Sequence, residues 1–311
     1  MEQQEFLEQL WQSDNISDNI KFFKNINSAD EIIRFSQSRP NPNIKIHQRG
    51  NADSEIKFII PTIDPNSIIC KNIEKIYNNY TVFFIESAGK YFNYSKAMNH
   101  GINHVLKNDD NTTYIILSND DIVLDRVSAL KLPNIAFSKE RAYCLTPSNG
   151  EYSGENVILT APGPFLSLKD YLFSRLNGDI VREEIVRILH NKSIPFAKVI
   201  SKKYFVDRLI FNYVEKFQHS KNLPKITNFA DFGIFHIKLL TKNKLDETFI
   251  NGWEDWDLSY RLKRQNIEIN KLNLKFERIG HASIGKVMSK EKEIIHSFLN
   301  GIYFYWKHLK G

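Results

Sequence analysis

The chain is short of the features that define several classes of protein. Only two cysteines, Cys70 and Cys144, occur in 311 residues, which is too few for a disulfide framework or a four-ligand zinc site. We therefore expect a reducing, cytoplasmic location. Residues 1–5 are acidic, whereas an export signal would be basic and then apolar, so no export signal is expected.

Long apolar runs are missing as well. Runs such as 58–60 and 114–117 are far shorter than the roughly 20 residues needed to cross a bilayer. Any membrane contact is therefore expected to be peripheral. The sequence also contains no internal repeat and no low-complexity tract.

What the chain does have is ordinary globular composition with a basic balance. Its hydrophobic content of 42% is enough to build a sizeable core at this length. The 42 Lys and Arg residues exceed the 36 Asp and Glu residues, which gives a net charge of +6. Such a balance suits an anionic partner, but it does not distinguish a nucleotide phosphate from an acidic lipid surface or a nucleic acid.

The texture of the sequence changes along the chain. Residues 1–50 are predicted to be a helical extension, in which Ser28 and Glu31 have capping-box spacing. From residue 56 onward, short strand-like runs at 57–60, 81–85 and 114–117 alternate with helical segments. This alternation predicts an α/β fold, in which crossover helices connect the strands of one sheet.

The second half of the chain interrupts this pattern. Residues 166–225 show helical spacing and are predicted to be a helical insertion. The insertion separates two parts of the α/β domain, residues 51–165 and 226–285. Residues 286–311 are predicted to form a last amphipathic helix.

Polar residues follow the first two predicted strands. Thr62 and Asp64 come after the first strand, and Glu86 comes after the second. Ligands of open α/β sheets bind beyond the carboxyl ends of the strands, so these side chains could contact a base or a ribose. Ordinary turn residues would give the same pattern.

A predicted helix after Asn93 offers a possible phosphate site. Lys96 and Asn99 lie in its first two turns, where the backbone of a helix N-terminus and a basic side chain could bind a phosphate. An ordinary capped helix would look much the same.

The third strand ends abruptly in Asn119, Asp120 and Asp121. Adjacent carboxylates repel one another unless a cation or a hydrogen-bond network compensates, and a hard metal that also binds pyrophosphate would do so. The alternative is a turn, for which these residues are also well suited.

Three further acids, Glu254, Asp255 and Asp257, occur within four residues, and Trp253 and Trp256 flank Asp255. Burying the three acids together would be costly, so at least one should face a cleft, bind a cation or act as a base. An indole could stack on a sugar ring. The alternatives are favourable charges at a helix N-terminus and tryptophans of the core.

The order of these motifs resembles that of the inverting glycosyltransferase family 2, whose nucleotide-sugar-binding fold is called GT-A. The resemblance spans roughly residues 56–285. It rests on Pro61, Thr62, Glu86, Ser87, Asn99, His100, Gly101, Asn119, Asp120, Asp121, Gly233, Asp246, Glu247, Glu254, Asp255, Asp257, Leu258, Ser259, Arg261, Leu262 and His281.

The resemblance implies a GT-A fold, a Rossmann-like nucleotide-binding sheet with a helical insertion and flanking terminal helices. It implies that residues 51–165 bind a nucleoside-diphosphate sugar and that residues 226–285 form the acceptor and catalytic half. The implied donor-binding residues are Thr62, Asp64, Glu86, Lys96, Asn99, Asn119 and Asp120.

The implied cofactor is Mg or Mn, bound by Asp121. Asn119 replaces the first acid of the usual Asp-x-Asp motif, so the principal ligand is either Asp121 or, with the register shifted by one, Asp120. His281 is implied either to complete the metal shell or to contact the diphosphate, and a structural histidine is the alternative.

The implied reaction transfers a sugar, with inversion, to a hydroxyl of a glycan, lipid or protein acceptor. Asp255 is the implied general base, Glu254 is the alternate, and Trp253 is the implied acceptor contact.

Proteins of other functional classes would need different sequence features. A nucleotidyltransferase would carry a glycine-rich, basic phosphate loop near its start, where this chain has Pro61, Thr62, Ile63 and Asp64. A glycoside hydrolase would not need the nucleotide-site motifs. A nucleic-acid-binding protein would cluster its basic residues, which here are spread among acids, so no nucleic acid is expected as a partner.

Overall fold

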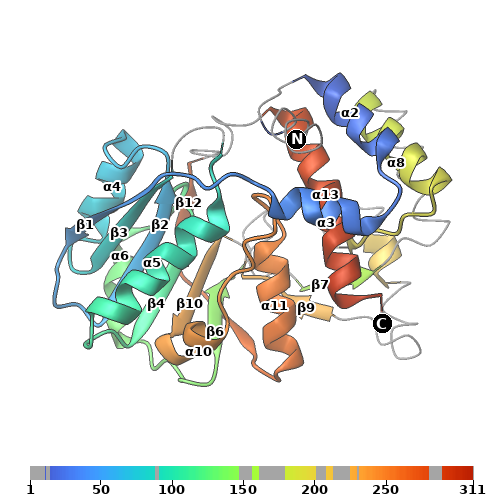
Figure 1. Cartoon of the computed structure of the whole chain (residues 1–311). Coiled ribbons are helices and arrows are strands. Elements are labelled where there is room, and N and C mark those ends of the chain that lie inside the picture. Colours follow the sequence, from blue (N-terminus) through green and yellow to red (C-terminus); the bar gives the residue numbers. More distant parts are fainter. Residues whose placement is uncertain are drawn as a thin grey trace.

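The computed structural model describes residues 11, 15–87, 91–146, 156–160, 179–200, 208–212, 225–229, 231–279 and 289–310. An α/β body and a mainly helical body lie side by side (Figure 1), and α11 (Glu254–Arg264) lies between them.

The α/β body is built on a seven-stranded sheet with the order β1-β3-β2-β4-β10-β6-β11. Five of its strands run parallel to one another, and β1 and β10 run antiparallel to their neighbours. The strands are β1 (Ile44–Gly50), β2 (Ile56–Thr62), β3 (Thr81–Ser87), β4 (Tyr114–Ser118), β6 (Ala142–Leu145), β10 (Phe232–His236) and β11 (Ile269–Leu272). The predicted α/β fold and its three strands at 57–60, 81–85 and 114–117 are confirmed.

Helices cover both faces of this sheet. Phe58 and Ile60 of β2 pack under α4 (Ile68–Ile76) and α6 (Arg126–Lys131), whereas Ile59 packs under α5 (Tyr94–Asn108), α10 (Ile237–Lys242) and α11. Strands buried on both faces are continuously apolar, which is why these runs were recognisable in the sequence. A short 3-10 helix, Leu132–Asn134, follows α6.

The N-terminal boundary predicted at residue 50 is wrong. β1 joins the sheet and pairs along its whole length with β3, from Ile44 opposite Ser87 to Gly50 opposite Thr81. Its residues alternate between partial burial and exposure, as expected of an edge strand. Because charged residues interrupt it, β1 contains no apolar run from which a strand would be predicted. The helical extension therefore ends before residue 44.

The helical body joins the two ends of the chain. α2 (Ile16–Asn25), α3 (Ala29–Gln37), α8 (Ile180–Asn191) and α13 (Lys290–His308) share one core. Ser28 accepts a hydrogen bond from the backbone N–H of Glu31 and so caps α3 as predicted. The predicted C-terminal helix is also confirmed. None of the described helices is long and apolar enough to span a membrane.

Within residues 166–225, the predicted helical insertion, the structure describes 179–200, 208–212 and 225, and this described part is not all helical; the rest lies outside the described residues. α8 forms as expected, but Lys198–Ile200 is a strand, β8. It belongs to a three-stranded sheet in which β7 (Asn156–Thr160) pairs with β8 on one side and with β9 (Lys225–Thr227) on the other. Strands of three residues are too short to show an alternating pattern. A further two-stranded sheet pairs β5 (Ile122–Leu124) with β12 (Phe276–Arg278).

Candidate active site

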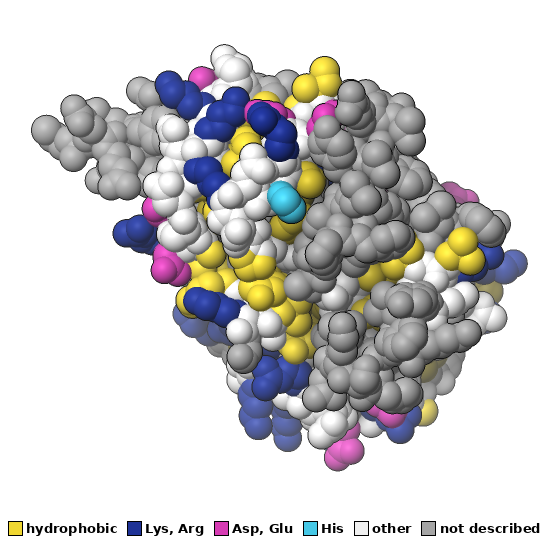
Figure 2. All heavy atoms as spheres, turned by 90° about the vertical axis from the view of Figure 1, so that its right-hand side faces the viewer, with side chains coloured by type: hydrophobic (Ala, Val, Ile, Leu, Met, Phe, Trp, Pro, Cys, Tyr) yellow, Lys and Arg dark blue, Asp and Glu magenta, His cyan; other side chains and the backbone are white. Residues whose placement is uncertain are grey.

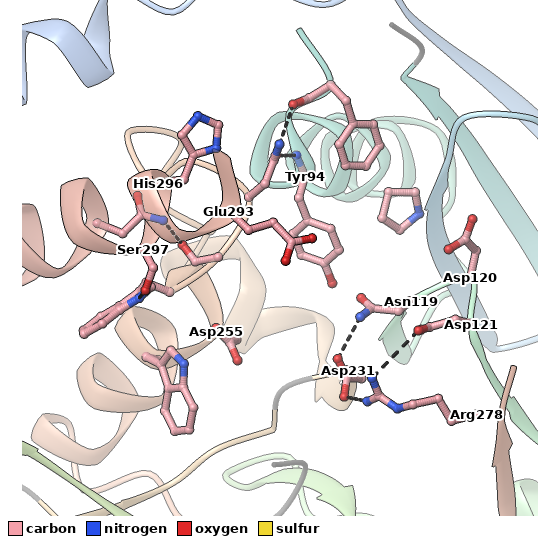
Figure 3. Close-up of a pocket in the computed structure, with 17 residues that line it drawn as sticks. Tyr94, Asn119, Asp120, Asp121, Asp231, Asp255, Arg278, Glu293, His296 and Ser297 are labelled. Carbon is pink, nitrogen blue, oxygen red and sulfur yellow. Dashed lines mark hydrogen bonds and ion pairs between the residues drawn. The ribbon is translucent and has the colours of Figure 1, made fainter. Parts of the chain in front are cut away.

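A cavity of about 360 Å³ lies where the α/β body meets α11 and α13. One wall follows the carboxyl ends of the parallel strands, and the other comes from the starts of the two helices (Figure 3). The lining residues include Pro61, Phe92, Tyr94, Asn119, Asp120, Asp121, Asp231, Asn251, Gly252, Trp253, Asp255, Trp256, Arg278, Glu293, His296, Ser297 and Asn300.

Sheet topology brings Asn119 and Asp231 together on the first wall. Asn119 directly follows β4, and Asp231 directly precedes β10, which is antiparallel to β4. The backbone N–H of Asn119 donates to the Asp231 carbonyl at 2.9 Å, and its side-chain amide donates to the Asp231 carboxylate at 2.8 Å. Asp231 is also paired with Arg278, at the end of β12.

The two adjacent aspartates have different surroundings. Asp120 accepts a hydrogen bond from the Thr62 hydroxyl at 2.9 Å. Asp121 lies 3.8 Å from Arg278, and its buried Oδ1 has no hydrogen-bond partner among the described residues. Burial raises the pKa of Asp121 to about 6, with repulsion from Asp231 and Asp120 adding to it and Arg278 opposing it.

These groups fit a hard divalent cation by their chemistry. In the part of the chain that the structure describes, the buried Oδ1 atoms of Asn119 and Asp121 have no hydrogen-bond partner, and Mg²⁺ and Mn²⁺ prefer oxygen ligands. Among the described residues, no three His, Cys, Asp or Glu side chains converge as a metal-binding group. A cation here would therefore combine Asp121 with amide, water or substrate oxygens. His281 lies outside the described residues.

The second wall begins with a left-handed stretch of backbone. Asn251, Gly252 and Trp253 have φ values of 46°, 156° and 73°, and Trp253 forms the N-cap of α11 without a side-chain hydrogen bond. Such conformations cost energy in non-glycine residues and need support from their surroundings.

Neighbouring elements supply that support. Asn300 of α13 accepts from the N–H of Ile250 at 2.8 Å and donates to the carbonyl of Gly252 at 2.8 Å. The Asn251 side chain donates to Phe92 O at 2.9 Å and accepts from the N–H of Tyr94 at 3.1 Å. The start of α11 is thereby fixed relative to both bodies.

The three clustered acids have separate environments. Asp255 lines the cavity and accepts a hydrogen bond from Asn228 at 2.8 Å. Glu254 is buried and accepts from the N–H of Gly252 at 2.6 Å. Burial raises the pKa values of both Asp255 and Glu254, and repulsion from Asp255 adds to the rise for Glu254.

Asp257 does not line the cavity and forms ion pairs inside the protein instead. Its fully buried carboxylate contacts Lys307 at 2.6 Å, His308 at 2.7 Å and Arg261 at 2.8 Å. These groups lower its pKa to about 2 against the opposing effect of burial. Asp257 therefore ties α11 to the end of α13, and only Asp255 of the three acids lines the cavity.

Several residues expected to bind the donor lie outside the cavity lining. The exposed Asp64 accepts from the N–H of Asn66 at 2.9 Å in a local turn. Glu86 pairs with His47 of β1 at 2.7 Å. Thr62 reaches the site only through its hydrogen bond to Asp120.

The two residues expected to bind phosphate are also elsewhere. The Lys96 ammonium donates to Asn41, in the segment before β1. The buried Asn99 amide donates to Leu245 O at 2.8 Å and to Glu247 at 2.9 Å. Asn93 accepts from the N–H of Lys96 and caps α5, so the local structure is that of an ordinary capped helix.

Several lining residues were missed in the sequence, among them Tyr94, Asp231, Arg278 and Glu293. Asp231 is an acid at the start of a strand rather than at its end, so only knowledge of the strand's direction would have placed it here. Tyr94 is buried, and desolvation together with the nearby carboxylates raises its pKa well above the usual value. Glu293 belongs to α13, outside the span of the recognised motifs.

The chain matches no protein-family model and no curated protein.

Proposed function

We propose that this protein is an inverting, metal-assisted glycosyltransferase of the GT-A type. The observation that carries the proposal is one cavity with two distinct carboxylate walls. Asp121 and the Asn119 amide lie on one wall, at the carboxyl ends of the parallel strands, and Asp255 lies on the other. A nucleotide sugar bound between them would have its diphosphate toward Asp121 and its anomeric carbon toward Asp255.

Asp255 acts as the general base in this proposal. Its carboxylate takes the proton from an acceptor hydroxyl while that oxygen forms a bond to the anomeric carbon and the bond to the diphosphate breaks. A single displacement inverts the configuration. A raised pKa makes Asp255 a stronger base than an exposed aspartate, and Asn228 orients its carboxylate. Glu254, which does not line the cavity, is the weaker candidate.

Asp121 and Asn119 hold the donor side. Asp121 is favoured over Asp120 as the metal ligand because Thr62 already donates to Asp120, whereas no described residue forms a hydrogen bond with Oδ1 of Asp121. A divalent cation bound there would stabilise negative charge on the departing diphosphate. Arg278 can contribute to the same task, because its guanidinium lies between Asp121 and Asp231.

The sheet is consistent with this assignment. Its parallel strands end at the cavity, as expected of a nucleotide site in an α/β fold, and the Asn119 to Asp121 motif follows β4, which lies beside β2. The acceptor in this proposal is a glycan, lipid or protein hydroxyl, and the protein works in the cytoplasm or peripherally at its membrane surface.

A nucleic-acid-binding function has less support. Five carboxylates line the cavity, from Asp120, Asp121, Asp231, Asp255 and Glu293, against Arg278 among the described lining residues. They would repel a phosphate backbone in the absence of a metal. On the face seen in Figure 2, the described Lys and Arg side chains form separate groups, with Asp and Glu side chains beside several of them.

A thermal-shift experiment tests the proposal. UDP, GDP and CDP are added in turn with Mn²⁺, and at least one should raise the Tm, because a ligand at 100 times its Kd stabilises the folded state by about 2.7 kcal/mol. The shift should vanish in Asp121→Ala and persist in Asp110→Ala, which removes an exposed acid outside the cavity. A shift retained in Asp121→Ala, or produced by DNA alone, would contradict the proposal.

A further inference from the structure

The C-terminal helix contributes a polar face to the cavity. Glu293, His296, Ser297 and Asn300 of α13 all line it, and their spacing of three and four residues places them on one side of the helix. Asn300 is used to hold the loop before α11. Glu293 and Ser297 lie nearer the start of the helix, so they can contact a bound molecule.

Two indoles lie beside this polar face. Trp253 and Trp256 line the cavity from the N-cap and the first turn of α11, on either side of Asp255 in the sequence. The Trp253 Nε1–H points to the Ser297 hydroxyl at 3.5 Å, and its ring packs 5.5 Å from that of Phe304. The Trp253 ring is thus held in place with part of its surface on the cavity.

Glu293 supplies an acceptor of hydrogen bonds next to these indoles. Its carboxylate is turned into the cavity (Figure 3) and is only partly buried. Among the described residues, no side chain or backbone group forms a hydrogen bond or ion pair with this carboxylate. A carboxylate accepts hydrogen bonds only, so its complementary ligand is a group of donors such as neighbouring hydroxyls.

The chemistry of this wall distinguishes between classes of acceptor. A sugar presents C–H groups that pack on an indole face and hydroxyls that donate to a carboxylate, and aromatic surface with a few polar groups is typical of small-molecule sites. Glu293 and Asp255 would repel an acceptor that carries a phosphate, and such repulsion lowers the affinity for phosphorylated acceptors relative to neutral ones. The wall therefore favours a neutral polyol.

We propose that Glu293, Ser297, Trp253 and Trp256 form a subsite for a neutral saccharide acceptor, with one of its hydroxyls directed at Asp255. The inference rests on the proposed transferase function and names the class of its acceptor. In the reaction, the saccharide hydroxyl loses its proton to Asp255, its oxygen forms the new bond to the anomeric carbon, and the nucleoside diphosphate leaves.

The test begins with the full-length protein, Mn²⁺ and the nucleotide sugar that it binds. Three sets of acceptors are offered: methyl glycosides of common hexoses, a polyprenyl phosphate in detergent, and serine- and threonine-containing peptides. We expect transfer to at least one methyl glycoside. Glu293→Ala should then raise the KM for that glycoside at least tenfold while changing the donor Kd less than twofold.

Matched variants distinguish recognition from loss of folding. Glu291→Ala removes another acid of the same helix that does not line the cavity. It should leave the KM for the glycoside and the Kd for the donor unchanged. Trp253→Phe keeps an aromatic ring without the N–H, and it should raise the acceptor KM less than Trp253→Ala. The Tm of each variant is measured alongside.

The outcomes separate the two proposals. A donor that binds and is consumed while only the polyprenyl phosphate or a peptide is glycosylated would overturn the saccharide subsite and leave the transferase function standing. An unchanged acceptor KM in Glu293→Ala would also overturn the subsite. A protein that binds no nucleotide sugar would overturn both.

Discussion

The side-chain amide of Asn300 donates a hydrogen bond of 2.8 Å to the carbonyl of Gly252, across 48 residues of sequence. Through this contact the last helix of the chain fixes the loop that begins α11, three residues before Asp255. A residue outside the recognised motifs therefore supports the orientation of the proposed base.

Replacing Asn300 with alanine should release this loop. The variant removes the donors to the carbonyls of Ile250 and Gly252 and the acceptor for the N–H of Ile250, all in a buried place. We expect a loss of about 1–3 kcal/mol in the free energy of unfolding, measured in urea, and a fall in kcat. Lys290→Ala, an exposed change in the same helix, serves as the control and should alter neither.

Asp255→Asn should abolish transfer with little effect on donor binding. The amide oxygen can still accept the hydrogen bond from Asn228, but it cannot take a proton from the acceptor. Removal of a general base costs about 10²–10⁴ in rate. Steady-state kinetics together with donor titration by calorimetry would measure both effects. Retention of most of the activity would exclude Asp255 as the base.

The buried Asp257 predicts a dependence of stability on pH. Its pKa is about 2 in the folded protein, below the usual 3.8, so its contribution is fully present above about pH 4 and is lost as the pH falls toward 2. The difference corresponds to about 2 kcal/mol. Asp257→Asn should lower the free energy of unfolding by about this amount at pH 7 and by much less near pH 2.

Denaturation curves recorded at both pH values test this. An equal loss in the free energy of unfolding at the two pH values would show that the ion pairs of Asp257 with Arg261, Lys307 and His308 do not cause the pH dependence.

Gly101→Ala should overpack the interface between α5 and the sheet. An added Cβ would lie 2.6 Å from Cγ2 of Ile59 and 3.0 Å from Cδ1 of Ile85, which are buried in the core. Overpacking of this kind costs about 1–3 kcal/mol. His100→Ala, at the exposed neighbouring position, should change the free energy of unfolding by less than about 0.5 kcal/mol. Equal Tm values for the two variants would contradict this packing.

The sequence predicted the features that depend on local pattern. Apolar runs marked β2, β3 and β4 because these strands are buried on both faces, and Ser28 marked the start of α3 because its hydroxyl caps a helix. The motifs around Asp121 and Asp255, more than 130 residues apart in sequence, do line one cavity.

Features that depend on distant contacts could not be predicted. Asn99 looked like a phosphate ligand, but its amide is used by the backbone of Leu245 and by Glu247, 146 and 148 residues away. Asp231 reaches Asn119 only because β10 runs antiparallel to β4, and no local pattern gives the direction of a strand. Glu293 lines the site because α13 packs across the helical body.

The most direct test of the proposed transferase function is release of a nucleoside diphosphate from a panel of nucleotide sugars in the presence of Mn²⁺, followed by mass spectrometry. We expect release from at least one sugar nucleotide, with loss of release on chelation of the metal and in Asp121→Ala. Absence of binding and of release for every member of the panel would contradict it, as would release that is equally fast in Asp121→Ala.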